Sequence, residues 1–321
     1  MRNYKKYLIF ITIFLLSVSC DEELLIESEF REAYVLNCVL DANSNYQIAT
    51  ITRTYETRDN YPLENYVDRF VSDAEVYIIK GQKKFQLMDS ILTLTTESSP
   101  SVKIPFYYIK NLNNIIGNEL QIIAVLPSGD TLKSYTSVPT MILIDYSDTD
   151  KIIPPSENAK NFKVSWNTNE VGELYFDPRL KILYYTEENG VLTEQFKDVP
   201  IKYENIGGIK LARYRLPSYS TSIVFSVELF RNTLQEIANE ATDKSKCYVA
   251  NAILEIYTFD KYLTSYYVGT HLMERFSIRL DEVDYYNIDG GFGIFGSFIK
   301  DNHIIAIDPR YLKSLGIEPF Y

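Results

Sequence analysis

Residues 119–138, ELQIIAVLPSGDTLKSYTSV, contain two short apolar-rich segments on either side of a compact turn. Residues 119–126 and 131–138 have the length and composition of β-strands bounded by turn residues. The Pro-Ser-Gly-Asp sequence between them is typical of a turn, because proline presets the backbone and glycine accepts positive φ. The stretch therefore predicts a β-hairpin, and it favours an antiparallel β-fold around it.

The residues before this hairpin continue the pattern of short strands and turns. Residues 33–40 alternate on a period of two, and residues 46–55 follow an Asp-Ala-Asn-Ser-Asn turn. No segment of this part has a convincing helical period. Residues 33–140 are therefore predicted to form an N-terminal antiparallel β-sandwich. Its further strands are expected at residues 74–79, 85–88, 91–95 and 106–109.

A polar stretch punctuated by prolines precedes a second predicted domain. Residues 141–160 contain Pro154 and Pro155 among Ser, Asp, Thr and Asn, and this composition indicates a linker and domain entry. Residues 161–321 then form a C-terminal β-rich domain. Its strands are expected at residues 161–166, 180–185, 247–257 and 275–280.

Helical signals occur only in this second domain. The helix expected near residues 309–315 has the clearest signals at both ends. Pro309 occupies its first position, and Gly316 follows its last apolar residue. The other two rest on apolar residues at helical spacing after a capping side chain. Helices are expected near residues 227–243, 261–272 and 309–315, capped by Ser226, Asp260 and Asp308.

The beginning of the chain has the features of an export signal. Three basic residues among the first six precede an apolar run at residues 8–18, followed by Ser19 and Cys20. That order is typical of a secretory signal peptide, and the run is shorter than the ~20 apolar residues of a membrane span. The cysteine resembles that of a bacterial lipobox, although Ser17 stands where a lipobox usually has Leu, so an ordinary secreted protein stays open. We predict a signal peptide at residues 1–19 and covalent lipid, palmitate included, on Cys20.

Asp21, Glu22 and Glu23 follow the lipidation site directly. The triplet resembles the export signal of surface lipoproteins in Bacteroidota-type bacteria, which favours the outer membrane and the face toward the medium. In enteric-type bacteria, an aspartate after the cysteine instead indicates retention in the inner membrane. An acidic run is also typical of a solvated tether, and we interpret residues 20–32 as one.

The net charge limits the classes of partner. The 321 residues carry a formal charge of −11, and removal of the signal peptide leaves 29 Lys and Arg against 43 Asp and Glu. Such a surface repels phosphate backbones, so nucleic-acid binding is not expected. A hydrophobic content of 46% is ample for packed cores.

Trp166 and two cysteines are interpreted as core residues. Trp166 shares one strand face with Phe162 and Val164, which favours packing over a role as a ligand platform. Cys38 and Cys247 remain after lipidation, and an exported protein can form disulfides. They lie in different predicted domains and spacing alone cannot establish geometry, so a bond and two free thiols both stay open.

A glycine-rich segment near the C-terminus matches the spacing of a dinucleotide-binding loop. Residues 291–296 read GFGIFG, but the strand, helix and βαβ unit that such a loop requires are not predicted around it. We interpret the segment as a structural turn with packed phenylalanines. Its glycines are Gly290, Gly291, Gly293 and Gly296.

No catalytic constellation is found in the sequence. His271 and Glu274 could provide two metal ligands on a helix, too few for zinc, and no nucleophile elbow is present. One acidic cluster could bind calcium or form a glycosidase pair, but it is more typical of a solvated loop. This weak metal candidate consists of Asp281, Glu282, Asp284 and Asp289. We expect no metal and no cofactor beyond the lipid.

Several of these features together resemble an uncharacterised family of Bacteroidota-type outer-membrane lipoproteins, a domain of unknown function. They are the lipobox, the strand pair at residues 35–40 and 48–54, the SDAEV sequence at 72–76 and NIDGGFGIFG at 287–296. Members are often encoded beside TonB-dependent receptors. The resemblance implies an immunoglobulin- or transthyretin-like sandwich and a second, fibronectin III-like β-rich domain with inserted helices. It implies no activity.

Three functional hypotheses follow. The first is a surface-anchored accessory lipoprotein that works with an outer-membrane receptor in uptake and binds a glycan or a small molecule. The second is an adhesive or fimbria-associated subunit, which would assemble by strand exchange. The third is a carbohydrate-active enzyme, which would need two carboxylates ~5–10 Å apart across a cleft.

Overall fold

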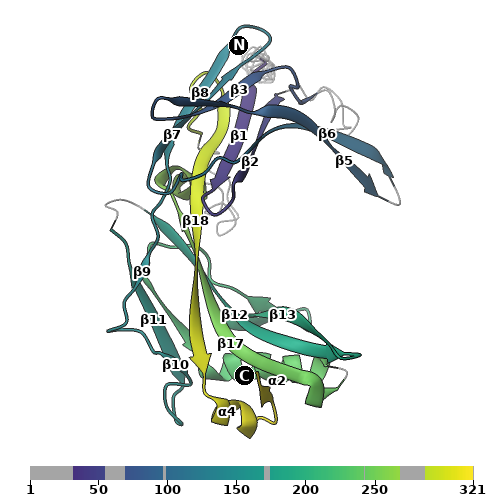
Figure 1. Cartoon of the computed structure of the whole chain (residues 1–321), viewed down its shortest axis with the longest axis vertical. Coiled ribbons are helices and arrows are strands. Elements are labelled where there is room, and N and C mark those ends of the chain that lie inside the picture. The colour runs from purple at the N-terminus through teal and green to yellow at the C-terminus, as the bar shows by residue number, and fades with distance from the viewer. Residues whose placement is uncertain are drawn as a thin grey trace, which may run out of the picture.

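The computed structural model describes residues 32–54, 69–96, 99–169, 174–241, 243–267 and 286–320. The fold is mainly β with few helices, which confirms the predicted class. No helix of the described residues is long and apolar enough to cross a membrane. Figure 1 shows two lobes, which we call the N-terminal and C-terminal lobes, joined by the long strand β18, Phe292–Ile307.

A ten-stranded sheet runs through both lobes. Its main path follows the order β13-β12-β17-β18-β1-β2-β6-β5, and the short strands β10 and β19 pair with β18 and β17. β18 is antiparallel to β17 and parallel to β1. The other strands are β1 Tyr34–Asp41, β2 Tyr46–Arg53, β5 Met88–Thr96, β6 Ser99–Lys110, β10 Ile152–Ile153, β12 Tyr175–Glu188, β13 Val191–Val199, β17 Cys247–Phe259 and β19 Glu318–Pro319.

The N-terminal lobe is a β-sandwich. A four-stranded sheet in the order β4-β3-β7-β8 packs against this end of the ten-stranded sheet (Figure 1). The hairpin expected at residues 119–138 forms β7 and β8, with Gly129 at a φ of 90° in the turn. The strands are β3 Glu75–Lys80, β4 Lys83–Gln86, β7 Glu119–Val125 and β8 Thr131–Ser137.

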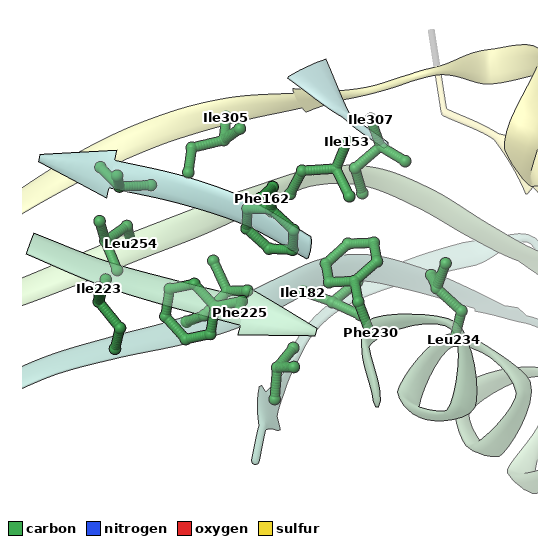
Figure 2. Close-up of a cluster of buried hydrophobic side chains, with 14 of the residues drawn as sticks. Ile153, Phe162, Ile182, Ile223, Phe225, Phe230, Leu234, Leu254, Ile305 and Ile307 are labelled. Atoms are coloured by element: carbon green, nitrogen blue, oxygen red, sulfur yellow. The ribbon is translucent and has the colours of Figure 1, made fainter. Parts of the chain in front are cut away.

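The C-terminal lobe packs a smaller sheet and a helix against the other end of the large sheet. The smaller sheet has the order β16-β11-β9, and β14 and β15 form a separate hairpin. Figure 2 shows Phe162 of β11, Phe225 of β16 and Phe230 of α2 meeting Leu254 and Ile305. The elements are β9 Leu143–Ile144, β11 Asn161–Asn167, β14 Lys202–Ile206, β15 Ile209–Arg213, β16 Ser222–Ser226 and α2 Val227–Glu240.

The helices follow the sequence signals with different ends. The Ser226 side chain accepts a hydrogen bond from the Leu229 amide, but α2 ends at Glu240 and a short 3-10 turn occupies Lys244–Lys246 (η2). Residues 261–267 are helical, and the remaining residues of the helix expected to 272 lie outside the described residues, as does the strand expected at 275–280. α4 covers Pro309–Ser314 and begins after the capping side chain of Asp308.

The three residues assigned to cores are buried. Trp166 is 1% exposed, with its ring 5.6 Å from that of Phe176. Cys38 and Cys247 are free thiols that lie in different cores. Burial raises the pKa of Cys38 to about 12 and raises that of Cys247. Both groups are therefore protonated at neutral pH and poorly reactive.

One feature of the N-terminal core departs from the predicted division of the chain. Its buried residues come from residues 36–138, together with Ile288 and Phe295 near the C-terminus. Phe295 lies opposite Cys38, because β18 pairs in register with β1. The sandwich expected from residues 33–140 alone thus contains a strand supplied by residues 292–307. A single strand that pairs with a partner over 250 residues away carries no local signal of that pairing.

A candidate binding face on the large sheet

Most of the site residues expected from the sequence lie outside the described residues. These are the lipidation site Cys20, the triplet Asp21, Glu22 and Glu23, and three of the four acidic residues, Asp281, Glu282 and Asp284. The fourth, Asp289, exchanges main-chain hydrogen bonds of 2.8 and 3.0 Å with Lys133. No group of three His, Cys, Asp or Glu side chains that could hold a metal is found in the described part of the chain.

The glycine-rich segment forms the expected turn only at its start, where Gly290 is a turn residue and Gly291 a bend, and it continues as a strand. Gly290 and Gly291 immediately precede β18, and Gly293 and Gly296 lie within it. A Cβ at Gly291 would lie 2.5 Å from the Tyr34 carbonyl oxygen, and one at Gly293 would overlap that of Leu36. These glycines therefore permit the backbones of β18 and β1 to approach closely. Glycine serves both in turns and at close backbone contacts, and the sequence alone did not distinguish the two.

Asn287 fixes the start of this strand. Its amide side chain donates to the Phe295 carbonyl at 2.7 Å and accepts from the Phe295 amide at 2.9 Å. Its own carbonyl accepts from the Ser134 hydroxyl at 2.6 Å. These contacts join β18 to β8 and explain, without any ligand, why polar residues surround the glycines.

One face of the ten-stranded sheet is turned away from both cores, and we call it the inner face. Figure 1 shows the sheet curved into a C, with the four-stranded sheet, the three-stranded sheet and α2 on the outside of the curve. Leu36, Cys38 and Leu40 of β1 point into the core, so Val39 between them belongs to the inner face. Register then places Ile48, Tyr108 and Met88 beside it across the sheet.

The N-terminal part of the inner face is apolar and aromatic. Val39, Ile48, Met88 and Leu92 are between 38% and 51% exposed. The rings of Tyr46 and Tyr108 are 5.5 Å apart. Exposed apolar side chains on several adjacent strands form a patch, and patches of this kind often mark interaction sites.

The C-terminal part of the inner face combines rings with charges. Tyr257 and Phe298 have ring centroids 6.0 Å apart, and the Arg179 guanidinium lies 5.0 Å from the Tyr257 ring. Phe196 on β13 is 51% exposed and Ile304 on β18 is 73% exposed. Cation–π contacts of this kind hold an arginine in place while leaving it able to donate.

The charges on this part of the face are paired. Arg179 donates two hydrogen bonds to Asp177, and these raise the pKa of the guanidinium. Burial lowers the pKa of Lys181, but the hydrogen bond and charge of Glu255, whose carboxylate lies 2.7 Å away, outweigh it and raise the pKa above its ordinary value. Lys300 lies 3.8 Å from the same carboxylate. The face therefore presents aromatic rings beside charged side chains that are held in ion pairs.

Three consecutive aromatic residues in the sequence are a signal for this face. Phe106, Tyr107 and Tyr108 are consecutive, so in a strand their rings must point to both sides of the sheet. Tyr107 is buried and donates to the Val71 carbonyl, whereas Tyr108 lies on the inner face. Apolar residues at both parities of a strand indicate either burial on both sides or a binding face.

A pocket lies elsewhere, between the end of the β12–β13 hairpin and the end of α2. It has a volume of about 420 Å³, and its acidic lining includes Glu187, Glu188, Glu240 and Asp243. Lys197 pairs with Glu240 at 2.5 Å. These carboxylates form no cluster of three that could hold a metal within the described residues, so we take the inner face as the main candidate.

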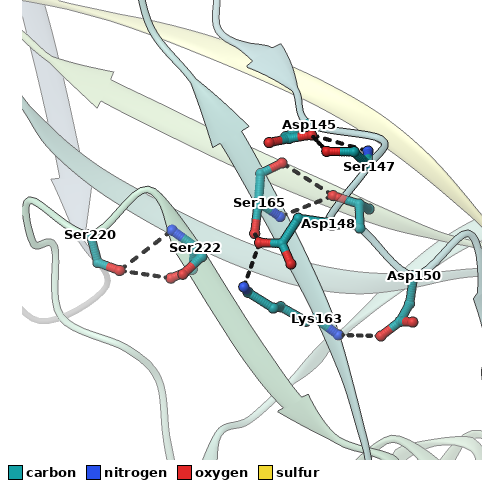
Figure 3. A network of polar contacts seen from close by, with 9 residues as sticks. Asp145, Ser147, Asp148, Asp150, Lys163, Ser165, Ser220 and Ser222 are labelled. Atoms are coloured by element: carbon teal, nitrogen blue, oxygen red, sulfur yellow. Dashed lines mark hydrogen bonds and ion pairs between the residues drawn. The ribbon is translucent and has the colours of Figure 1, made fainter.

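The polar residues of the predicted linker close the edge of β11 (Figure 3). Asp148 accepts from the Lys163 ammonium at 2.5 Å and from the Ser165 hydroxyl at 2.8 Å, and these bonds lower its pKa. Asp150 and Lys163 exchange two further bonds through the Lys163 backbone. The cluster of aspartates at 145–150 thus has a structural role in protecting a strand edge.

In the described part of the chain, the Nε2 atom of His303 has no hydrogen-bond partner. His303 is half-buried on the core side of β18, and burial lowers its pKa despite the charge of Asp301. Asp301 accepts a hydrogen bond from the Ile142 amide at 3.2 Å. His271 lies outside the described residues.

Comparison with known proteins identifies no family. No family description and no curated protein sequence match the chain. Among solved structures, the C-terminal globular domain of an oligosaccharyltransferase from Pyrococcus abyssi is similar over 71% of this chain and 47% of that chain, with 9% identity and a TM-score of 0.27. This chain thus spans about half of that structure, and a likeness at that score carries no functional argument.

Proposed function

We propose that the protein is a lipid-anchored binding protein of a bacterial cell envelope. It resides on the outer membrane, faces the medium, and works with a TonB-dependent receptor in the uptake of a glycan or a small molecule. The export signal and Cys20 support the anchor. The inner face supports the binding role and is the observation that carries the proposal.

The composition of the inner face fits a protein partner. Tyrosine, phenylalanine and arginine are enriched where proteins contact one another, and the residues that contribute most are usually of these types. Arg179 and Tyr257 already hold each other in place, so little side-chain entropy is lost when a partner covers them. The receptor is therefore expected to contact the inner face around Tyr257.

A crosslinked pull-down of the full-length lipidated protein from native envelopes tests this proposal. We expect recovery of one TonB-dependent receptor in near-equal amount, and its loss in the Cys20→Ala variant, which is not anchored. Tyr257→Ala should reduce receptor recovery about tenfold, because a central interface residue contributes more than about 1 kcal/mol.

Tyr135→Ala is the matched control. Tyr135 is 60% exposed on β8, in the four-stranded sheet outside the curve. Its removal should leave receptor recovery unchanged. Equal losses with both variants, or no receptor with the wild-type protein, contradict the proposal.

A structural or adhesive subunit is the second candidate, because β5 ends the ten-stranded sheet and has no second neighbour in the part of the chain that the structure describes. Such a subunit adds strands without closure and forms long assemblies. A ladder of multimers of the protein, in place of a receptor, would favour this function.

A further inference from the structure

β5 is an edge strand without a second neighbour among the described residues. Met88–Thr96 pairs with β6 on one side only and ends the order of the sheet. Figure 1 shows the β5–β6 hairpin extending beyond the body of the N-terminal lobe. Its unpaired backbone groups are a template for another strand.

Both faces of this edge expose an apolar side chain. Met88 and Leu92 on the inner face are 51% and 48% exposed, and Ile91 on the opposite face is 58% exposed. Asp89 is the single charged residue of the nine. An edge of this kind lacks the lysines, prolines and inward charges that usually prevent pairing.

The opposite edge of the same sheet shows such protection. β13 also has nine residues, but it carries Glu194, Lys197 and Asp198. Lys197 forms ion pairs with Glu236 and Glu240 of α2. The two edges of one sheet thus differ in their defence against pairing, and β5 is the unprotected one.

We propose that the free edge of β5 binds the same edge of a second copy of this chain, antiparallel and across a two-fold axis. Full overlap of Met88–Thr96 with itself places Leu92 opposite Leu92 and Ile91 opposite Thr93. Asp89 then stands opposite Thr95, so no like charges meet. An antiparallel pair on a two-fold axis closes the assembly at two copies.

The charge distribution favours this edge as the place where two copies meet. The whole chain carries −11, whereas residues 88–110 contain two acidic and two basic residues and are neutral. Two molecules with the same strong charge approach most easily through neutral surfaces. A charged strand of another protein would meet no complementary charge on β5, whereas the same neutral edge of a second copy meets it with no like charges opposed.

A disulfide crosslink tests the proposal on the full-length lipidated protein in native envelopes. Residues opposite each other in an antiparallel pair have Cα atoms about 4.5–5.5 Å apart, which suits a disulfide. We expect Leu92→Cys to give a dimer and no larger species on a non-reducing gel after mild oxidation. Cys38 and Cys247 do not interfere, because both are buried.

Leu192→Cys is the matched control. Leu192 lies on the inner face of β13 and is 47% exposed, against 48% for Leu92. It should give no crosslinked dimer under the same oxidation, because β13 lies at the opposite edge of the sheet from β5. No dimer with Leu92→Cys, or an equal yield from both variants, overturns the proposal.

Charged substitutions of Leu92, the residue on the two-fold axis, provide a second, independent test of the dimer. Leu92→Lys and Leu92→Glu each place like charges opposite each other, so each variant alone should lose at least about 90% of the wild-type dimer. Co-expression of the two, with different tags, should restore a mixed dimer. Failure of the mixture to associate also overturns the proposal, whatever the receptor pull-down shows.

Discussion

The core of the N-terminal lobe draws on both ends of the chain, whereas that of the C-terminal lobe is built from residues 142–317 alone. The first core is completed by Ile288 and Phe295, which follow most of the C-terminal lobe in the sequence. β18 supplies Ile305 and Ile307 to the second core as well. One strand therefore contributes buried side chains to both.

This difference matters because the first 140 residues lack a neighbour for β1. Without β18, one side of β1 exposes its backbone groups, and a free edge of this kind favours incorrect pairing. Contacts between segments far apart in sequence also form late, since closing a long loop costs entropy. The two lobes are thus expected to behave as one cooperative unit with β18 as the connecting element.

Gly293→Ala should have the largest effect on this connection. A Cβ at this position would overlap the Leu36 carbonyl, and the φ of 107° is unfavourable for alanine. β18 would have to separate from β1, and we expect a loss of at least about 5 kcal/mol in the free energy of unfolding, measured by urea denaturation.

Gly208→Ala is the control for Gly293→Ala, because it introduces backbone strain without overlap of the added Cβ with other atoms. Its φ is 86°, but nothing lies within 4 Å of the added Cβ. A residue forced into this region costs about 1–3 kcal/mol. If both variants lose the same stability, strain alone accounts for the effect and the close approach of β18 to β1 is irrelevant.

Phe295→Ala tests whether the two cores unfold together. Phe295 is fully buried in the N-terminal core, and truncation should cost about 3–5 kcal/mol. Trp166, the single tryptophan, reports on the C-terminal core. Because β18 spans both cores, the urea transition of Trp166 fluorescence should shift together with the far-UV circular dichroism.

Phe230→Ala is the counterpart in the C-terminal core. Phe230 lies on α2 and is also fully buried, so a similar loss is expected. Both variants should give one transition with coincident probes. A Trp166 transition that stays in place in Phe295→Ala would show that the lobes unfold separately.

The sequence predicted local elements better than their assembly. The alternation at residues 33–40 and the turn at 127–130 are sufficient for β1 and the β7–β8 hairpin, because strand period and turn chemistry act over a few residues. The position of β18 between β1 and β17 depends on backbone approach at Gly291 and Gly293. That requirement is visible only when the partner strand is known.

The candidate face was less predictable than the fold. Arg179 and Glu255 lie opposite each other on β12 and β17, although 76 positions separate them in the chain. Pairing of this kind depends on strand register, which sequence patterns do not fix for strands that are apolar on both faces. A motif search finds residues close in sequence and therefore misses a face assembled from seven or more strands.

Asp260 lies at the junction of the lobes and gives the smallest effect, which depends on pH. Its carboxylate accepts hydrogen bonds from Thr136 of β8, from Ser297 of β18 and from the Leu263 amide. Burial raises its pKa to about 6, since the hydrogen bonds offset the loss of hydration only in part. The folded protein therefore binds this proton more tightly than the unfolded chain.

The sign of the pH effect follows from that difference. Stabilisation by the proton is fully present below the unfolded pKa, about 4, and is lost as pH rises through about 6, which amounts to roughly 2–3 kcal/mol. Asp260→Asn cannot titrate, so the stability advantage of the wild-type protein over this variant should be larger at pH 5 than at pH 7.5. Asp243→Asn is the control: hydrogen bonds from Ser245 lower the pKa of Asp243, so its contribution is lost only as pH falls below about 4, and the difference between wild type and this variant should not change between pH 5 and pH 7.5. A difference between wild type and Asp260→Asn that does not change with pH would mean that this carboxylate does not respond to its burial between the lobes.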